Sequence, residues 1–198
     1  MEEIINPQRL YSRSEVLSKP SPVPSVNGIY GWYFCEIPGI TPNEGCLVSG
    51  NKTLLYVVIS PDKAVKPNST QNLRKRITYH YRGNAEGSTL RRTLGALLAP
   101  SSGFPLRRVG SGKRMTLTHA GEKWLDSWMD QNAFVCWMRH PSPWDVEKEL
   151  ISDISLPLNI RGNELHPFIT KLKALRKGAI RQARELPVAD KISTARST

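Results

Sequence analysis

Residues 28–37 read GIYGWYFCEI, a run of aromatic and aliphatic side chains that ends at Pro38 and Gly39. Aromatic and β-branched residues favour strands, and Pro and Gly interrupt them, so this stretch predicts a β-strand. A second run, TLLYVVIS at residues 53–60, is continuously apolar and predicts a buried strand. The loop of residues 40–52 contains Gly, Pro and Asn. Because this connection is short, the two strands are predicted to be antiparallel.

Helical patterns and one more strand follow along the chain. Leu73 and Ile77 recur at helical spacing, in a helix predicted to begin at Asn68 or Ser69 and to end at Gly83. The other predicted elements are a short helix capped by Ser12, a helix from Ser88 closed by Pro100, a hairpin turning at 110–112, a helix from Thr118, a strand at 133–139, a helix from Trp144 closed near Pro157, and a basic helix over 166–186. This order predicts an α/β (α+β) fold, a small sheet covered by helices.

The charge of the chain is strongly positive and unevenly distributed. Lysine and arginine total 28 against 17 acidic residues, for a net charge of +11. Residues 71–92 carry six basic residues and one acid, residues 101–114 four and none, and residues 161–198 nine and three. Such patches suit a polyanion, most simply nucleic acid, although basic surface also serves solubility alone.

Cysteine usage and hydropathy bear on the compartment. Cys35, Cys46 and Cys136 form no C-x-x-C pair, and a sparse, odd set suits a reduced compartment. The N-terminus begins with acidic residues and lacks the apolar core of a signal peptide. No apolar run approaches the about 20 residues needed to span a bilayer. We therefore expect a cytoplasmic protein that does not enter a membrane.

Several polar residues are not explained by propensity. Arg76 and His80 lie four apart in RITYH, which places both on one helix face, a turn apart. Tyr30 lies in the first strand, and alternation predicts that Tyr56 in the second shares a face with Leu54 and Val58. A strand tyrosine is most often a packing residue with its hydroxyl at the edge.

A glutamate lies at the margin of a predicted helix core. Glu147 is three residues before Leu150 and four before Ile151, whereas Glu149 points toward solvent. A glutamate whose carboxylate is partly buried needs a cationic side chain or a metal ion as a partner. Asn159 follows this helix, where its ordinary role is that of a turn or cap residue.

Five short motifs occur in a characteristic order. They are GIY at 28–30, LYVVIS at 55–60, the Arg76-x-x-x-His80 helix, E-x-x-L-I from Glu147, and PLN ending at Asn159. Each motif alone is weak, but the ordered set resembles the GIY-YIG nuclease superfamily, and most closely its branch with an Arg-x-x-x-His helix, which includes some type II restriction endonucleases. The resemblance covers residues 26–160, with an insertion at about 101–131. It leaves residues 1–25 as an N-terminal appendage and residues 161–198 as a basic C-terminal helix and tail.

The resemblance implies a fold, an activity and roles for residues. The fold is a small, mainly antiparallel sheet flanked by helices, with one catalytic face. The activity is endonucleolytic hydrolysis of phosphodiester bonds, usually in DNA, with one divalent ion, Mg²⁺ or Mn²⁺. The residues it assigns are Tyr30 and Tyr56 as motif tyrosines, Arg76 at the scissile phosphate, His80 beside the base or a phosphate oxygen, Glu147 as the metal ligand, and Asn159 as an orienting residue.

This chemistry is physically consistent. A carboxylate-bound divalent ion stabilises a leaving oxygen as a Lewis acid, and the planar fork of an arginine fits a phosphate. An unperturbed tyrosine has a pKa of about 10, so only about 0.1 % is ionised at neutral pH. Our working hypothesis is that Tyr30 activates water with His80 as the proton acceptor behind it, and that Tyr56 is the second candidate.

One position departs from the family pattern. The third residue of the second motif is normally glycine, and here it is Val58. Glycine in a strand usually marks close approach by another backbone or a ligand. Valine here either pushes a helix outward or narrows the site beside Tyr56.

The expected partner is DNA, single- or double-stranded, bound by a monomer or a homodimer. The basic residues expected to contact it are Arg74, Lys75, Arg82, Arg91, Arg92, Arg107, Arg108, Lys113, Arg114, Lys171, Lys173, Arg176 and Lys177.

A zinc site is not favoured by the spacing of Cys and His. Cys136 and His140 are four apart in a predicted strand, about 13 Å, which is too far to share a metal. His119 and His166 have no neighbours at ligand spacing.

Two other function classes are alternatives to a nuclease. A catalytically weak or inactive nucleic-acid-binding module on the same fold is favoured weakly by Val58 and opposed by Glu147, because a pure binder has no need of that carboxylate. Metal-dependent cleavage separates the two classes. A protein-interaction module would use the tryptophans Trp124, Trp128, Trp137 and Trp144, although core packing is their commoner use.

Overall fold

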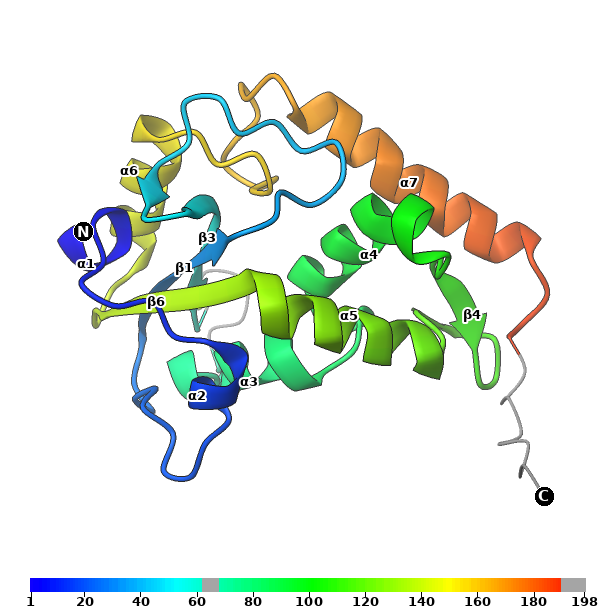
Figure 1. Cartoon of the computed structure of the whole chain (residues 1–198), viewed down its shortest axis with the longest axis horizontal. Coiled ribbons are helices and arrows are strands. Elements are labelled where there is room, and N and C mark those ends of the chain that lie inside the picture. Colours follow the sequence, from blue (N-terminus) through cyan, green and yellow to red (C-terminus); the bar gives the residue numbers. More distant parts are fainter. Residues whose placement is uncertain (62–67, 190–198) are drawn as a thin grey trace.

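The protein, a computed structural model describing residues 1–61 and 68–189, is built around a four-stranded sheet of order β2-β3-β1-β6 (Figure 1). The strands are β1 (Gly28–Phe34), β2 (Val48–Ser49), β3 (Lys52–Ser60) and β6 (Ala133–Arg139). Every neighbouring pair is antiparallel, which confirms the predicted pairing of the first two long strands. Strand β1 is central and buried along its whole length.

A bulge in β3 determines which side chains accompany Tyr56. Trp32 pairs with Tyr56 and Tyr33 with Leu54, so that Leu55 is the extra residue. Tyr56 packs in the core cluster that contains Trp32, and Leu54 packs in the cluster on the other side of the sheet. The predicted shared face of Tyr56 and Leu54 is therefore wrong, because the extra residue reverses the alternation between them.

Beyond the bulge, the pairing of β1 with β3 places the predicted site residues on the same face of the sheet. Tyr30 lies directly opposite Val58, and both belong to the cluster that contains Tyr56. Residues paired across antiparallel strands point to the same face. Tyr30, Tyr56 and Val58 thus share one face of the sheet.

Helices cover both faces of the sheet. One face, with Tyr30 and Tyr56, packs against α2 (Arg13–Val16), α3 (Leu73–Arg82), α4 (Thr89–Ser102), α5 (His119–Asn132) and α7 (Ile169–Glu185). The other packs against α1 (Glu2–Ile5) and α6 (Trp144–Asp153). In Figure 1 the long helix α7 lies beside α4, away from α6.

The N-terminal residues are part of this core. Ile4 and Val23 are fully buried, Val16 is 1 % exposed, and Tyr11 forms a β-bridge with Val135. The prediction that residues 1–25 form an appendage is therefore wrong. Isolated apolar residues in short helices and turns give no periodic signal, although the sheet needs them as cover.

The region of residues 101–131 folds as predicted. The hairpin consists of β4 (Arg107–Val109) and β5 (Arg114–Thr116), and Thr118 caps α5 by accepting a hydrogen bond from the Gly121 amide. Leu125 on α5 is fully buried in the common core.

Some helix ends differ from the prediction. Helix α3 is capped by Asn72, whose side chain accepts from the Lys75 amide, and not by Asn68 or Ser69. Helix α4 continues through Pro100 to Ser102 and ends at Gly103, which has the left-handed φ of +71° that favours glycine. Helix α7 forms within the predicted basic segment, and the tail at residues 190–198 lies outside the described residues. In the described ranges, no helix is both long and apolar enough to cross a membrane.

Candidate active site

A cavity of about 580 Å³ opens along the second half of β3, where consecutive residues from Tyr56 to Ser60 line it. Segments far apart in the sequence line it: the end of β3, the start of α4, and single side chains from α3, α6 and α7. Four residues with predicted catalytic roles are among its lining: Tyr56, Arg76, Glu147 and Asn159. Tyr30 and His80 are fully buried in the adjacent core and do not line the cavity.

Helix α3 presents Arg76 and His80 on one face, as the four-residue spacing predicts. Arg76 lines the cavity and donates from Nη1 to the Gly87 carbonyl at 3.1 Å. His80, one turn later, is enclosed by the core. The pair therefore divides into a guanidinium that faces the cavity and an imidazole behind it.

A buried hydrogen-bonded chain runs from the sheet to the start of α4. The Tyr30 hydroxyl lies 2.9 Å from Nε2 of His80, and Nδ1 of His80 lies 2.7 Å from the Ser88 hydroxyl oxygen. Ser88 is the N-cap of α4 and accepts from the Arg91 amide at 3.1 Å. If Ser88 accepts from Nδ1–H, Nε2 is left as the acceptor for the Tyr30 hydroxyl. The sequence predicts Ser88 as the start of a helix, and this cap position is the signal that points to it.

Burial determines the protonation states of Tyr30 and His80 in this series of hydrogen bonds. It raises the pKa of Tyr30 well above its usual value, against the lowering effect of the nearby Arg76 cation. It lowers the pKa of His80, and the cations of Arg76 and Arg91 lower it further. In the free protein the proton therefore stays on Tyr30, and His80 is neutral.

Tyr56 is the tyrosine that reaches the cavity. It is 8 % exposed, and burial raises its pKa to about 12. Arg76 and Arg176 act in the opposite direction on that pKa, and Glu147 raises it. Val58 also lines the cavity, so the side chain at the usual glycine position occupies part of the site.

Helix α6 places Glu147 at the cavity from the margin of its buried face. Leu150 and Ile151 are buried, Glu147 is partly buried, and Glu149 is exposed, as the helical spacing predicts. Glu147 stands in the first turn of α6.

Asn159 secures the edge of β3 beside the cavity. Its side chain accepts from the Val57 amide at 2.9 Å and donates to the Val57 carbonyl at 2.7 Å. Next to it, the Leu158 amide donates to the Leu55 carbonyl. Asn159 therefore satisfies both polar groups of a strand residue between Tyr56 and Val58, which fixes the strand that carries them.

Two further features add positive potential to the cavity. Arg176 of α7 lines it, and burial together with the Arg92 cation lowers the pKa of its guanidinium. Helix α4 begins there, since its first residue Thr89 lines the cavity, and a helix N-terminus carries partial positive charge. The sequence predicted Arg176 as part of a basic helix but not that α7 reaches the site.

Arg91 is a correction to the predicted DNA-contacting set. Its side chain is fully buried and pairs with Glu122 at 2.6 Å and Asp126 at 2.7 Å on α5. It also donates to the carbonyls of His80 and Tyr81 at the end of α3. Arg91 therefore joins α3, α4 and α5, because a buried guanidinium must have all its charge and donors compensated.

The other predicted basic residues reach the surface to different extents. Arg92, Arg107 and Arg108 are partly buried and donate to backbone carbonyls, and Arg114 pairs with Glu86 at 2.9 Å. The predicted residues that are exposed include Arg82, Lys113, Lys171, Lys173 and Lys177.

The donors at the cavity fit one hard cation. Glu147 supplies a carboxylate, and the Ser60 hydroxyl, buried and lining the same cavity, has no hydrogen-bond partner within the described ranges. Those ranges contain no group of three or more His, Cys, Asp or Glu residues at metal-binding distance. Mg²⁺ is often held by one or two carboxylates, with waters and substrate phosphate as its other ligands.

Comparison with known proteins identifies the family. Searches of curated proteins and of solved structures give no significant match. The family model of the GIY-YIG catalytic domain matches residues 28–178, which includes every motif of the predicted site and the first part of α7. This match confirms the resemblance at the level of the superfamily, and the chain belongs to the GIY-YIG nuclease family.

Proposed function

We propose that the protein is a metal-dependent endonuclease that hydrolyses phosphodiester bonds in DNA. The observation that carries this proposal is that Arg76, Glu147 and Tyr56, from three separate elements, line one cavity. Phosphodiester hydrolysis requires a cation for the phosphate, a ligand for a metal and a group that handles a proton, and this cavity offers all three.

The scissile phosphate is assigned to the arginine side of the cavity. Arg76 faces the cavity with donors beyond the one given to Gly87, and Arg176 approaches from α7. The N-terminus of α4 adds further positive potential. Two guanidinium groups would bind non-bridging oxygens and stabilise the charge that develops on them.

The metal is assigned to Glu147. A divalent ion bound there, Mg²⁺ or Mn²⁺, would supply Lewis-acid stabilisation of the leaving oxygen. The Ser60 hydroxyl, which has no hydrogen-bond partner among the described residues, is a second protein oxygen at the cavity.

Tyr30 remains our candidate for activating water, with His80 as the acceptor of its proton. Of the two motif tyrosines, Tyr30 is the one with an acceptor nitrogen in contact among the described residues, Nε2 of His80 at 2.9 Å. The Glu147 carboxylate is among the charges that raise the pKa of Tyr30. Neutralising Glu147 would remove this contribution and so lower the pKa of Tyr30. Tyr56, whose pKa responds in the same direction, is the second candidate because it opens directly on the cavity.

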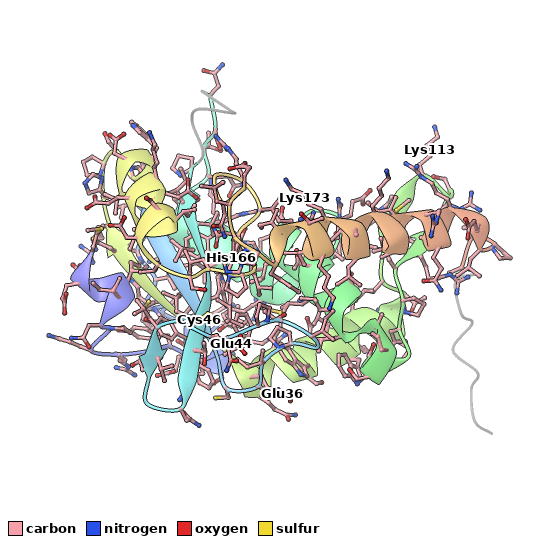
Figure 2. All side chains as sticks on the ribbon, turned by 90° about the horizontal axis from the view of Figure 1, so that it is seen from above. Glu36, Glu44, Cys46, Lys113, His166 and Lys173 are labelled. Carbon is pink, nitrogen blue, oxygen red and sulfur yellow. The ribbon has the colours of Figure 1, made fainter. Side chains whose placement is uncertain are left out.

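We assign the binding of the DNA backbone outside the cavity to exposed lysines. Lys113 in the β4–β5 turn and Lys173 on α7 project from the same side of the molecule (Figure 2). Lys171 and Lys177 on α7 are also exposed. Such side chains bind the phosphate backbone regardless of sequence.

The test is direct. Supercoiled plasmid and single-stranded DNA are incubated with the purified protein in Mg²⁺, in Mn²⁺ and with a chelator. We expect cleavage only with a divalent ion. DNA binding without cleavage under every condition would contradict the proposal and would leave a binding module on this fold.

A further inference from the structure

A second cavity of about 610 Å³ adjoins the active-site cavity along α3. Both are lined by Gln71, Arg76 and Gly87, so the second continues from the arginine assigned to the scissile phosphate. The second cavity adds Arg74 and Lys75, and none of its lining residues within the described ranges is acidic. We name it the α3 groove.

The α3 groove contains an exposed aromatic ring. Tyr79 lines it and is 38 % exposed. Trp144, which is similarly exposed at 40 %, lines neither cavity. Tyr79 therefore combines an accessible ring with a basic surface, a combination used to bind unpaired nucleotides.

Two glycines hold this ring in place. A Cβ added at Gly87 would lie 2.2 Å from the Tyr79 hydroxyl oxygen, and one added at Gly83 would lie 2.6 Å from Cε1 of the ring. Any side chain larger than hydrogen at either position would thus displace the ring. Because the Tyr79 ring already packs closely against these two glycines, its side chain loses little conformational freedom when a ligand stacks on it. The Gly87 carbonyl also accepts from Arg76, so one residue supports both side chains.

The cations of the groove can bind phosphate beside this ring. Arg74 donates from Nε to the Val23 carbonyl at 2.6 Å, and Lys75 donates to the Thr70 carbonyl at 3.2 Å. Arginine has five N–H donors and lysine three, so both have donors beyond these contacts. A phosphate next to the one at Arg76 would meet them.

We propose that the α3 groove binds an unpaired nucleotide of the cleaved strand, with its base stacked on Tyr79 and its phosphate at Arg74 and Lys75. This inference rests on the proposed function, because it takes the phosphate at Arg76 as the scissile one. A base in a continuous duplex is stacked on both faces and cannot lie on Tyr79. The preferred substrates are therefore single strands, flaps and bulges rather than intact duplex.

The test measures binding separately from cleavage. An oligonucleotide with one 2-aminopurine is titrated, single-stranded and fully paired, into protein that carries Glu147→Gln to prevent cleavage. In that background Tyr79→Ala is expected to bind the single strand about 5- to 150-fold more weakly, the range typical of one stacked base. Tyr79→Phe keeps the ring and is expected to keep the affinity and the 2-aminopurine signal. Gly87→Ala, which displaces the ring, is expected to reduce both.

Trp144→Ala is the matched control, since it removes an exposed aromatic ring outside both cavities. Equal binding of single strand and duplex, unchanged in Tyr79→Ala, would overturn the inference. A loss that Trp144→Ala reproduces would overturn it too. These outcomes are independent of the proposed activity: a protein that cuts no DNA but loses single-strand binding in Tyr79→Ala refutes the activity and supports the groove.

Discussion

The hydroxyl of Tyr30 lies 2.9 Å from Nε2 of His80, and both side chains are fully buried behind the cavity that holds Arg76. A hydrogen bond thus joins a sheet residue and a helix residue fifty positions apart. This contact distinguishes Tyr30 from Tyr56, which lines the cavity but has no histidine beside it among the described contacts.

Removal of the Tyr30 hydroxyl tests its role as the base. We expect Tyr30→Phe to lower the rate of DNA cleavage about 10²- to 10⁴-fold, the range of general acid–base catalysis, and Tyr56→Phe to lower it less. The control is Tyr33→Phe, from the same strand but the opposite face, which removes a buried hydroxyl bound to the Ile4 carbonyl. Full activity in Tyr30→Phe would eliminate the assignment.

Ser88 is expected to orient His80 as well as to cap α4. Ser88→Ala should cost about 0.5–2 kcal/mol of stability through the lost cap. It should also lower cleavage and shift its pH profile, because Nδ1 of His80 loses its partner. Ser12→Ala removes the comparable cap of α2 and should cost stability without changing the pH profile. Identical profiles for both variants would reduce Ser88 to a cap, and Ser88→Thr should restore the wild-type profile.

Arg91 is expected to matter for stability and not for DNA. Arg91→Lys cannot make the contacts to Glu122, Asp126 and the end of α3 together, and we expect a loss of about 1–3 kcal/mol in chemical unfolding. The salt dependence of DNA binding should not change. Lys171→Ala, at an exposed position of α7, should instead reduce the slope of log affinity against log salt by about 1 and leave unfolding unchanged. If Arg91→Lys instead changed the salt dependence of DNA binding and left unfolding unchanged, Arg91 would be a DNA-contacting residue.

Acid should destabilise the protein partly through His80. Its folded pKa lies below the unfolded value of 6.5, so below that pH the unfolded state binds a proton that the native state excludes. Stability is therefore lost as pH falls through 6.5, by up to about 1.4 kcal/mol per pH unit for one proton. Burial also lowers the pKa of His166, which adds a contribution of the same sign.

Urea unfolding between neutral pH and mild acid measures this slope. His80→Gln should show a shallower slope than the wild type, and His119→Gln, at an exposed position of α5, should not. An unchanged slope in His80→Gln would mean that His80 is not held neutral in the native state.

Much of the sheet and the order of the site motifs could be predicted from the sequence. Strand β6 has the predicted bounds, because AFVCWMR is a compact apolar run before Pro141. Glu147 lies at the margin of α6 and Glu149 in solvent, because helical spacing alone determines this. Local sequence patterns are thus sufficient to predict these strands and helices and the direction of the side chains within them.

Features that depend on distant partners could not be predicted. The bulge at Leu55 is a property of the pairing between β1 and β3, which no single strand encodes. Arg91 and Arg92 are adjacent arginines in one helix, and the sequence does not distinguish between them. Arg91 becomes a core residue because the carboxylates of α5 pair with it. Arg176 and Ser88 join the site through the packing of α7 and α4, which is likewise a tertiary property.

The most direct test of the central claim compares Glu147→Gln with Glu149→Gln in plasmid cleavage across a Mg²⁺ titration. Both changes remove one charge from the same helix, at the cavity and in solvent respectively. We predict metal-dependent cleavage in the wild type and in Glu149→Gln, and its loss in Glu147→Gln with DNA binding retained. Equal cleavage by both variants, or cleavage by the wild type that persists with chelator, would contradict a metal-dependent nuclease centred on Glu147.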